Sequence, residues 1–306
     1  MVTRNALLYL AKQEGLKDFA TRFRPFKKMT TRFVAGEDIE EAIAAIREIN
    51  ARGCTASFDH LNESVANAAE TAEEVREYLN ILKRIDETGI KSNVSIKLTQ
   101  FGLGIDPELA YKNARTVVED AARRGNFVRV DMEDSKVTQV TIDIFKRLRS
   151  EFDLNTVGIV LQSYLRRTYE DAQDLLKIPA RIRICKGAYN EPPEVAFPDK
   201  KDVDDNYVRV MKLLLSSGVY HGIATHDPNM INATKRYARE QGIGKEAFEF
   251  QMLYGVRRDL QERLARDGHN MRVYVPYGKH WYPYFMRRLA ERPANIWFVV
   301  KNLFKG

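Results

Sequence analysis

Short β-branched segments alternate with longer amphipathic segments through most of this chain, and no other feature constrains its fold as strongly. The expected strands are residues 55–60, 94–99, 127–132, 157–162, 181–187, 222–226, 249–253 and 272–277. Helical patterns such as residues 69–88, 107–124 and 229–241 lie between them. Strands that alternate with helices form a parallel sheet, and eight such units within about 250 residues predict closure into a (βα)8 barrel. A doubly wound sheet is the alternative, but its G-x-G-x-x-G turn is absent.

The size and composition fit one barrel domain preceded by a helical segment. The chain has 306 residues, of which 44% are hydrophobic and 30% are charged. We expect residues 1–50 to form an N-terminal helical segment and residues 51–306 to form the barrel with its C-terminal helix. No apolar run reaches the roughly 18 residues of a membrane span and no signal peptide is recognisable, so we expect a cytoplasmic protein. Cys54 and Cys185 are too few for a disulfide framework and are expected to be reduced and buried.

The net charge of +7 is concentrated near the N-terminus. Residues 1–30 contain seven basic and two acidic side chains, and Leu16, Phe19 and Phe23 form an apolar stripe. Such a helix either lies on an anionic membrane surface, here the inner face of the cell membrane, or packs on its own domain, and the sequence leaves both open. No nucleic-acid-binding motif accompanies the basic residues, so no nucleic-acid partner is expected. The histidines lack metal-ligand spacing, so no metal is expected.

The segment after the last expected strand carries the clearest candidate binding residues. A helix is expected over residues 283–292, because Pro283 suits a first helical position and Pro293 cannot continue a helix. Four side chains then share one helix face: Tyr284, Arg287, Arg288 and Glu291. Adjacent arginines beside aromatic rings favour binding of a carboxylate or phosphate, and the glutamate one turn away can hold them while the site is empty. A solvated basic helix face is the alternative.

Polar residues also collect where the expected strands end. They are Asp59 and Glu63 after the first strand, Lys97, Asp131 and Gln162 on the next three, Arg183 and Lys186 on the fifth, Thr225 and His226 on the sixth, and Tyr274 on the eighth. Active sites of such barrels lie at the carboxyl ends of the strands, so this ring of groups predicts a site. Singly, the residues are ambiguous. Lys97 suits an imine-forming lysine, a substrate ligand or an ion-pair partner of Asp131, and His226 suits a turn as well as a ligand. The K-G-A-Y turn at residues 186–189 suits a phosphate, because glycine permits close backbone approach.

These residues stand in motifs that resemble those of the monofunctional bacterial proline dehydrogenases. The motifs are S-I-K-L-T-Q around Lys97, R-V-D-M-E-D around Asp131, V-L-Q-S-Y around Gln162, R-I-C-K-G-A-Y at residues 183–189, A-T-H at His226 and Y-x-x-R-R-x-x-E at residues 284–291. The resemblance covers nearly the whole chain. It implies a distorted (βα)8 TIM-type barrel whose last helix lies over the carboxyl ends of the strands. It also implies oxidation of L-proline to Δ1-pyrroline-5-carboxylate by hydride transfer to FAD, with a membrane quinone as the final electron acceptor, as the first step of proline degradation to glutamate.

The same resemblance implies a role for each candidate residue. Substrate-binding residues would be Lys97, Tyr274, Tyr284, Arg287, Arg288 and Glu291, with the two arginines and the lysine on the carboxylate and the tyrosines around the pyrrolidine ring. The catalytic residues would be Asp131, which would pair with Lys97 and help to shape the pocket, and Arg183, which would lie near flavin N5. Residues in contact with the flavin would be Met132, Gln162, Lys186, Gly187, Ala188, Thr225 and His226. Glu63 would be a gate residue that pairs with Arg287 when no substrate is bound.

Two other classes of function remain open on the residues alone. One is a class I aldolase-type barrel, in which Lys97 or Lys186 forms an imine with a carbonyl substrate. The other is a basic scaffold that binds acidic partners or membranes through residues 1–30. The sequence does not identify the base that accepts the amine proton, the quinone, the oligomeric state, or the preference for proline over hydroxyproline.

Overall fold

The computed structural model describes residues 32–62, 65 and 67–291, and the side chains of all of these except residues 287 and 289–291. The strands are β1 (Thr55–His60), β2 (Ser92–Ile96), β3 (Val128–Val130), β4 (Val157–Gln162), β5 (Arg181–Cys185), β6 (His221–Ala224), β7 (Phe248–Leu253) and β8 (Asn270–Tyr277). The helices are α4 (Ile39–Ala51), α5 (Ala68–Thr88), α6 (Pro107–Arg123), α7 (Thr138–Glu151), α8 (Thr168–Leu175), α9 (Lys200–Leu215), α10 (Pro228–Glu240), α11 (Arg258–Arg266) and α12 (Trp281–Glu291), with a short 3-10 helix, η1 (Lys245–Ala247). The expectations for residues 1–30 lie outside the described residues.

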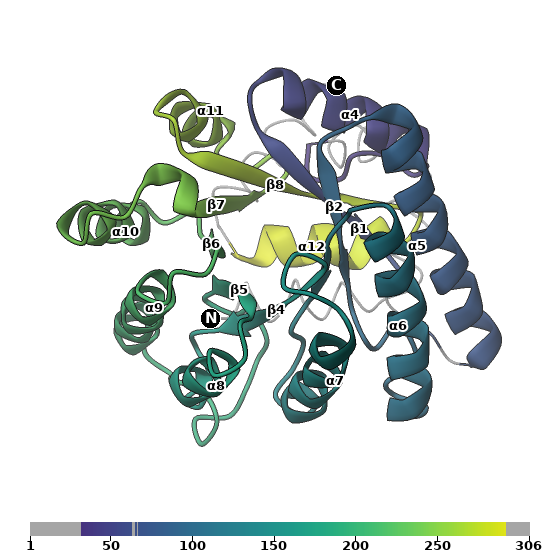
Figure 1. Ribbon diagram of the computed structural model, residues 1–306, viewed down its shortest axis with the longest axis horizontal. Coiled ribbons are helices and arrows are strands. Elements are labelled where there is room, and N and C mark those ends of the chain that lie inside the picture. Colours follow the sequence, from purple (N-terminus) through teal and green to yellow (C-terminus); the bar gives the residue numbers. More distant parts are fainter. Residues whose placement is uncertain (1–31, 63–64, 66, 292–306) are drawn as a thin grey trace.

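The eight strands form a closed parallel barrel in chain order, which confirms the predicted (βα)8 fold. β8 closes the ring on β1 over six residue pairs, among them Ser57 beside Tyr274. Helices α5 to α11 surround the sheet (Figure 1). All eight predicted strands are present. β1 and β4 have the predicted bounds at both ends, and each of the other six strands differs by a few residues at one end or at both. Lys97 and Asp131, for example, stand one residue beyond β2 and β3 rather than on them.

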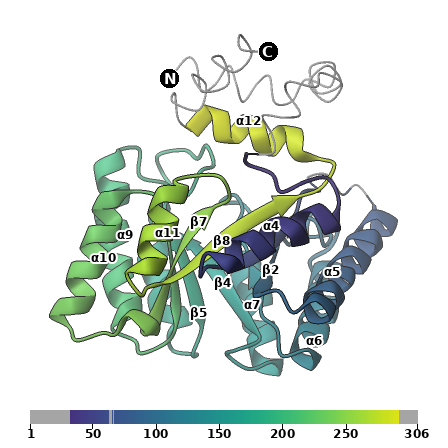
Figure 2. The ribbon, with the colours of Figure 1, turned by 90° about the horizontal axis from the view of Figure 1, so that it is seen from above.

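The last helix departs from the usual barrel arrangement. Figure 2 shows α12 lying across one end of the barrel, above the strands, as the resemblance implied. The position on the outer wall between β8 and β1 is taken instead by α4, which contacts both strands. α4 begins where Asp38 accepts a hydrogen bond from the Glu41 N–H at 2.9 Å, a typical N-cap. The division of the chain at residue 50 remains a prediction.

The predicted start of the last helix was wrong. α12 begins at Trp281, so Pro283 is its third residue rather than its first. Proline is tolerated there because the N–H groups of the first helical turn have no intrahelical partner in any case. The prediction that both cysteines are buried was also partly wrong. Both are free thiols, but only Cys54 is buried, whereas Cys185 is partly exposed at the end of β5.

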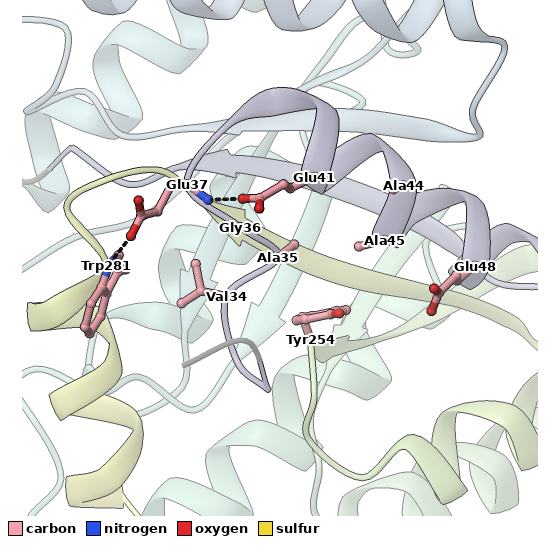
Figure 3. A pocket seen from close by; sticks show the side chains of 10 residues that line it. All are labelled: Val34, Ala35, Gly36, Glu37, Glu41, Ala44, Ala45, Glu48, Tyr254 and Trp281. Carbon is pink, nitrogen blue, oxygen red and sulfur yellow. Dashed lines mark hydrogen bonds between the residues drawn. The ribbon is translucent and has the colours of Figure 1, made fainter. Parts of the chain in front are cut away.

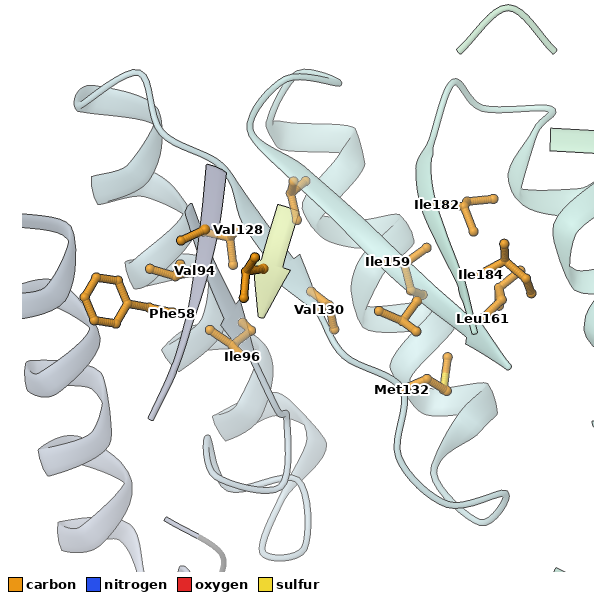
Figure 4. Packing of buried hydrophobic residues seen from close by; sticks show 14 of the residues in the cluster. Phe58, Val94, Ile96, Val128, Val130, Met132, Ile159, Leu161, Ile182 and Ile184 are labelled. Carbon is orange, nitrogen blue, oxygen red and sulfur yellow. The ribbon is translucent and has the colours of Figure 1, made fainter. Parts of the chain in front are cut away.

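The two faces of the strands have opposite chemistry. Outward-facing side chains are mostly apolar and pack against the surrounding helices, as Figure 4 shows for Phe58, Val94, Val128, Ile159 and Ile182. Inward-facing side chains are mostly polar: Ser57, Asp59, Ser95, Arg129, Asp131, Arg183, Glu249, Gln251, Arg272 and Tyr274. Barrel interiors are usually filled by branched apolar residues. In this protein, therefore, the apolar core lies between sheet and helices, and the barrel interior is a hydrogen-bonded polar column.

A second apolar cluster holds α12 in place. It comprises Phe33, Val34, Leu61, Trp281, Tyr282, Tyr284, Phe285 and Met286. The ring centroids of Phe33 and Phe285 lie 6.1 Å apart, and the Trp281 indole donates a hydrogen bond to Glu37 at 3.2 Å. Figure 3 shows this contact beside a surface hollow of about 350 Å³. We call this group the anchor cluster, because it joins residues 33–34 to the helix that covers the barrel.

Candidate active site

One cavity of about 920 Å³ opens at the carboxyl ends of the strands, beneath α12. Its size suits a bound small molecule or cofactor. The candidate residues that line it are Asp59, Lys97, Asp131, Met132, Gln162, Arg183, Lys186, Gly187, Ala188, Thr225, His226, Tyr274, Tyr284 and Arg288. Glu63 and the side chains of Arg287 and Glu291 lie outside the described residues, so their expected roles remain predictions. The structure thus brings candidate residues from seven strand ends and from α12 to one place.

Lys97 does not pair with Asp131, as expected, but with Asp59. Its ammonium forms an ion pair with the Asp59 carboxylate and lies 3.4 Å from the Tyr274 hydroxyl. Asp131 instead accepts one hydrogen bond from Arg183 and one from Tyr274. Burial lowers the pKa of Lys97, but the carboxylates of Asp59 and Asp131 outweigh this effect and raise the pKa above its usual value. Lys97 therefore remains an ammonium ion, which suits an anion-binding group and not an imine-forming amine.

Asp131, Arg183 and Tyr274 form the floor of the cavity. The Arg183 guanidinium donates to Asp131 Oδ1 at 2.8 Å, and the Tyr274 hydroxyl donates to Asp131 Oδ2 at 2.8 Å. A second arm of Arg183 donates to the Ser95 hydroxyl at 3.0 Å. The guanidinium carbon lies 5.3 Å from the centre of the Tyr274 ring. These contacts come from three different strands and fix the direction of the Arg183 charge.

The K-G-A-Y turn is built by close packing and paired charges. The Lys186 ammonium lies 2.5 Å from Asp204 and 2.7 Å from Asp227. Gly187 has φ +96°, and a Cβ atom at this position would lie 2.1 Å from the Tyr164 ring. Only glycine therefore fits the turn. Because two carboxylates compensate the Lys186 charge, and the nearby Lys200 pairs with the same two carboxylates, the backbone of the turn is the better candidate for contact with an anion.

The amide of Gln162 and the imidazole of His226 are held in one orientation. Gln162 Nε2 donates to the backbone oxygens of Met132 and Glu133 at 2.7 and 3.2 Å. His226 Nε2 accepts a hydrogen bond from the Leu253 N–H at 2.9 Å, so the neutral ring carries its proton on Nδ1. Thr225 accepts a hydrogen bond from the Asp227 N–H at 3.0 Å. These side chains border the cavity with fixed donor and acceptor positions.

Three buried atoms on cavity residues, Gln100 Oε1, Gln162 Oε1 and Arg183 Nε, have no hydrogen-bond partner within the described part of the chain. Two of them are acceptors, and the Arg183 Nε is a donor. Buried polar atoms are normally paired. A planar ring system with hydrogen-bond donors and acceptors along its edge, such as a flavin, is chemically suited to residues of this kind. The residues present therefore fit the cofactor that the resemblance implied.

The α12 helix contributes the cavity roof. The Arg288 guanidinium carbon lies 5.2 Å from the centre of the Tyr284 ring, and both side chains border the cavity. A guanidinium group that lies over an aromatic ring uses its flat face for this contact, so the N–H groups at its edge can bind an anion. Tyr284 belongs to the anchor cluster, so this cluster fixes the position of Tyr284, and of the Arg288 group that stacks on it, over the end of the barrel.

Several cavity residues were missed in the sequence. Glu133 is buried and accepts hydrogen bonds from the backbone and hydroxyl of Thr99, and burial raises its pKa. Asn62 and Gln100 are joined through a hydrogen bond of 2.6 Å. Glu133 stands in the D-M-E-D motif and could have been found there. Gln100 likewise ends the S-I-K-L-T-Q motif. Asn62 carries no such signal, because its place depends on how two loops meet.

Known proteins resemble this chain in sequence and in fold. The proline dehydrogenase family profile matches residues 42–301. The chain is 42% identical over 305 residues to "Proline dehydrogenase 2" of Bacillus subtilis, with 100% of both chains covered. It is 43% identical over 306 residues to "Proline dehydrogenase" of Deinococcus radiodurans, covering 99% of this chain and 98% of that one. Among solved structures, proline utilization A (PutA) from Bdellovibrio bacteriovorus superimposes with a TM-score of 0.82 at 27% identity, covering 87% of this chain and 33% of the PutA chain.

Proposed function

Because the chain belongs to the proline dehydrogenase family, we propose that the cavity beneath α12 is the site at which it oxidises L-proline to Δ1-pyrroline-5-carboxylate. The protein is an oxidoreductase of the first step of proline catabolism. The observation that supports this site most strongly is the meeting of Arg288, Lys97 and the Asp131–Arg183 pair around one cavity. It combines a cationic side for a carboxylate with a fixed polar floor.

The carboxylate is the strongest handle that proline offers, since the rest of the molecule is a small ring. Arg288 and the neighbouring Arg287 would bind it, and Lys97 would complete the site. Asp59 contributes by keeping Lys97 protonated. Tyr274 and Tyr284 would form the walls beside the ring. Fixing the carboxylate orients the reacting carbon on the other side of the ring nitrogen, and such positioning can supply several kcal/mol of the barrier.

FAD is proposed as the cofactor on two grounds. The family resemblance implies it, and the unpaired polar atoms of Gln162 and Arg183 suit the edge of a flavin ring. When bound, FAD supplies the hydride acceptor. Residues that would hold it are Met132, Gln162, Arg183, the turn at residues 186–188, Thr225 and His226. Arg183 would place a positive charge against the ring, with Asp131 and Ser95 holding its direction.

Anaerobic titration with L-proline tests the cofactor and the reaction together. The purified protein should be yellow, and the flavin absorbance should bleach as proline is added. A colourless protein that borohydride traps covalently with a carbonyl compound would instead support the aldolase alternative. A protein that shows neither behaviour would support the scaffold alternative.

Substitution of Arg288 tests the carboxylate site. Arg288→Met should raise the KM for proline by tens to hundreds of fold, because a charge-assisted hydrogen bond contributes about 2–3 kcal/mol. Arg258→Met is a matched control, because Arg258 also stacks on a tyrosine, Tyr254, at 5.3 Å, but does not border the cavity. The control should leave the KM unchanged. An unchanged KM in Arg288→Met would reject the carboxylate assignment.

A membrane quinone is proposed as the electron acceptor, on the family resemblance alone. No helix in the described part of the chain is long and apolar enough to cross a membrane. Vesicle flotation with and without residues 1–30 tests the predicted docking segment. Equal binding of the truncated protein would remove these residues from the proposal.

A further inference from the structure

Arg129 carries a positive charge into the barrel interior without a carboxylate to balance it. The residue is only 1% exposed. Its guanidinium donates through one nitrogen to the backbone oxygens of Ile159 and Arg181, at 3.2 and 2.5 Å. Its Nε atom has no hydrogen-bond partner, and no side-chain carboxylate of the described residues forms an ion pair with it. Glu249 is the acidic group whose charge reaches Arg129, but Glu249 already pairs with Arg272 at 2.9 Å.

The neighbours of Arg129 increase the free-energy cost of burying its charge. Arg181 and Arg183 are both close enough to lower its pKa, in addition to the larger effect of burial. The Phe127 ring and the backbone at Gly158 leave space for the Arg129 side chain, but they carry no negative charge that would neutralise it. The guanidinium groups of Arg129 and Arg181 both lie over the Phe127 ring, at 4.7 and 4.4 Å from its centre. A Cβ atom on Gly158 would lie 2.6 Å from the Arg129 guanidinium. A buried, unbalanced charge lowers stability, and such costs persist mainly where function requires them.

The position of Arg129 shows what its charge can act on. Strand register places Arg129 beside Gly158 on β4, and places Arg183 beside Val160, two residues further along β4. Arg129 therefore lies one inward-facing layer, roughly 6.6 Å along the strands, below Asp131 and Arg183. Its guanidinium remains protonated in proteins. The field of this charge in a low-dielectric interior reaches the cavity floor with little screening.

We propose that Arg129 is a positioning residue that acts through its charge, keeping the cavity floor electropositive so that a flavin bound there is more readily reduced. The inference rests on the proposed FAD site. A neutral oxidised flavin that accepts a hydride becomes an anion, so a positive charge beneath it favours the reduced state. Arg183 alone is largely balanced by Asp131, whereas Arg129 is not. The unbalanced charge of the floor therefore comes from the layer below.

The test is a pair of substitutions that separates the effect of the Arg129 charge from the effect of its hydrogen bonds to two backbone carbonyl groups. Arg129→Lys keeps the charge and loses the bridge to two carbonyl groups, whereas Arg129→Gln keeps a donor and loses the charge. The readout is the anaerobic equilibrium between the bound flavin and a redox dye of known potential. By Coulomb's law over roughly 10 Å at an effective dielectric constant near 20, Arg129→Gln should lower the ratio of reduced to oxidised flavin by about tenfold. This equals about 30 mV for a two-electron couple. Arg129→Lys should stay within about twofold of the unsubstituted protein.

Two further variants keep the test decisive. Glu249→Gln leaves Arg272 without its carboxylate partner and should raise the ratio of reduced to oxidised flavin. This variant therefore tests the effect of interior charge on the flavin even if the Arg129 variants fail to fold. Arg149→Gln is the matched control, because Arg149 also donates to backbone carbonyls, those of Pro179 and Phe152, but on the outer layer. It should leave the equilibrium unchanged. An unshifted equilibrium in Arg129→Gln, or an equal shift in Arg129→Lys, would overturn the inference while the protein still binds flavin that proline reduces. A protein without bound flavin would overturn the proposed function itself.

Discussion

The inward and outward faces of the same eight strands differ in almost every physical respect. On β1, Phe58 points outward into the apolar layer, and its neighbours Ser57 and Asp59 point inward to partners on other strands. Outward residues stabilise the fold through apolar burial, which depends on area and tolerates approximate geometry. Inward residues contribute directed hydrogen bonds and charges, which depend on orientation. Stability and chemistry are thus separated by one residue along each strand, and substitutions on the two faces should have different consequences.

The largest effect expected from this contrast is on folding stability. Phe58→Ala should reduce the free energy of unfolding by about 3–5 kcal/mol, because it empties a fully buried site that packs edge-on against the Tyr277 ring. Ser57→Ala, the adjacent substitution on the inward face, should cost only about 1 kcal/mol, from the loss of its hydroxyl contact with Ser95. Urea denaturation measures both. Equal losses in the two variants would contradict the division of roles between the faces.

A smaller effect is expected on catalysis. Tyr274→Phe removes the hydroxyl that donates to Asp131 and lies near Lys97, without emptying space. The loss of one hydrogen bond of about 1–1.5 kcal/mol should lower kcat/KM for proline by about tenfold and change the melting temperature little. Stopped-flow flavin reduction and thermal unfolding provide the two measurements. A variant with full activity and reduced stability would place Tyr274 with the structural residues.

The smallest expected effect concerns His60, a polar exception on the outward face. Its Nδ1 lies 3.0 Å from the buried Glu74 carboxylate. Burial lowers the pKa of His60, but the hydrogen bond and charge of Glu74 outweigh this effect and raise it. A raised folded-state pKa contributes stability that is complete below the unfolded value, about 6.5, and is lost as pH rises through the folded value. His60→Gln should therefore destabilise the protein more at pH 5.5 than at pH 8.5.

His269 gives a control of opposite sign for this measurement. Burial, with the charges of Lys235 and Lys245, lowers its pKa to about 4. The unfolded chain then binds a proton at a higher pH than the folded one, so His269 costs stability as pH falls below about 6.5. His269→Gln should accordingly gain stability relative to the parent protein at pH 5.5. Unfolding free energies that respond to pH identically in both variants would exclude the role given to Glu74.

Local periodicity explains why so much of the fold was predictable. The alternation of β-branched and amphipathic segments predicted eight strands in a closed ring, because the spacing of apolar residues indicates which face of each helix or strand is buried. Residues at the strand ends were predicted to meet, since the carboxyl ends of parallel strands share one edge. The start of α12 was not predicted, because Pro283 is compatible with any position of a first helical turn. Trp281 joins the helix through its contact with Glu37, which lies far away in sequence.

The amino-acid order by itself determined the strand and helix pattern, the positions of charged groups at the strand ends, and the motifs of the proline dehydrogenase family. These properties depend on short-range geometry, which repeats along the chain. Only the tertiary structure decided the partners of the charges. Lys97 could pair with either of two carboxylates, and in the structure Asp59 pairs with Lys97 while Asp131 accepts hydrogen bonds from Arg183 and Tyr274. The unbalanced charge of Arg129 is likewise invisible in sequence, because electrostatic balance is a property of neighbours in space.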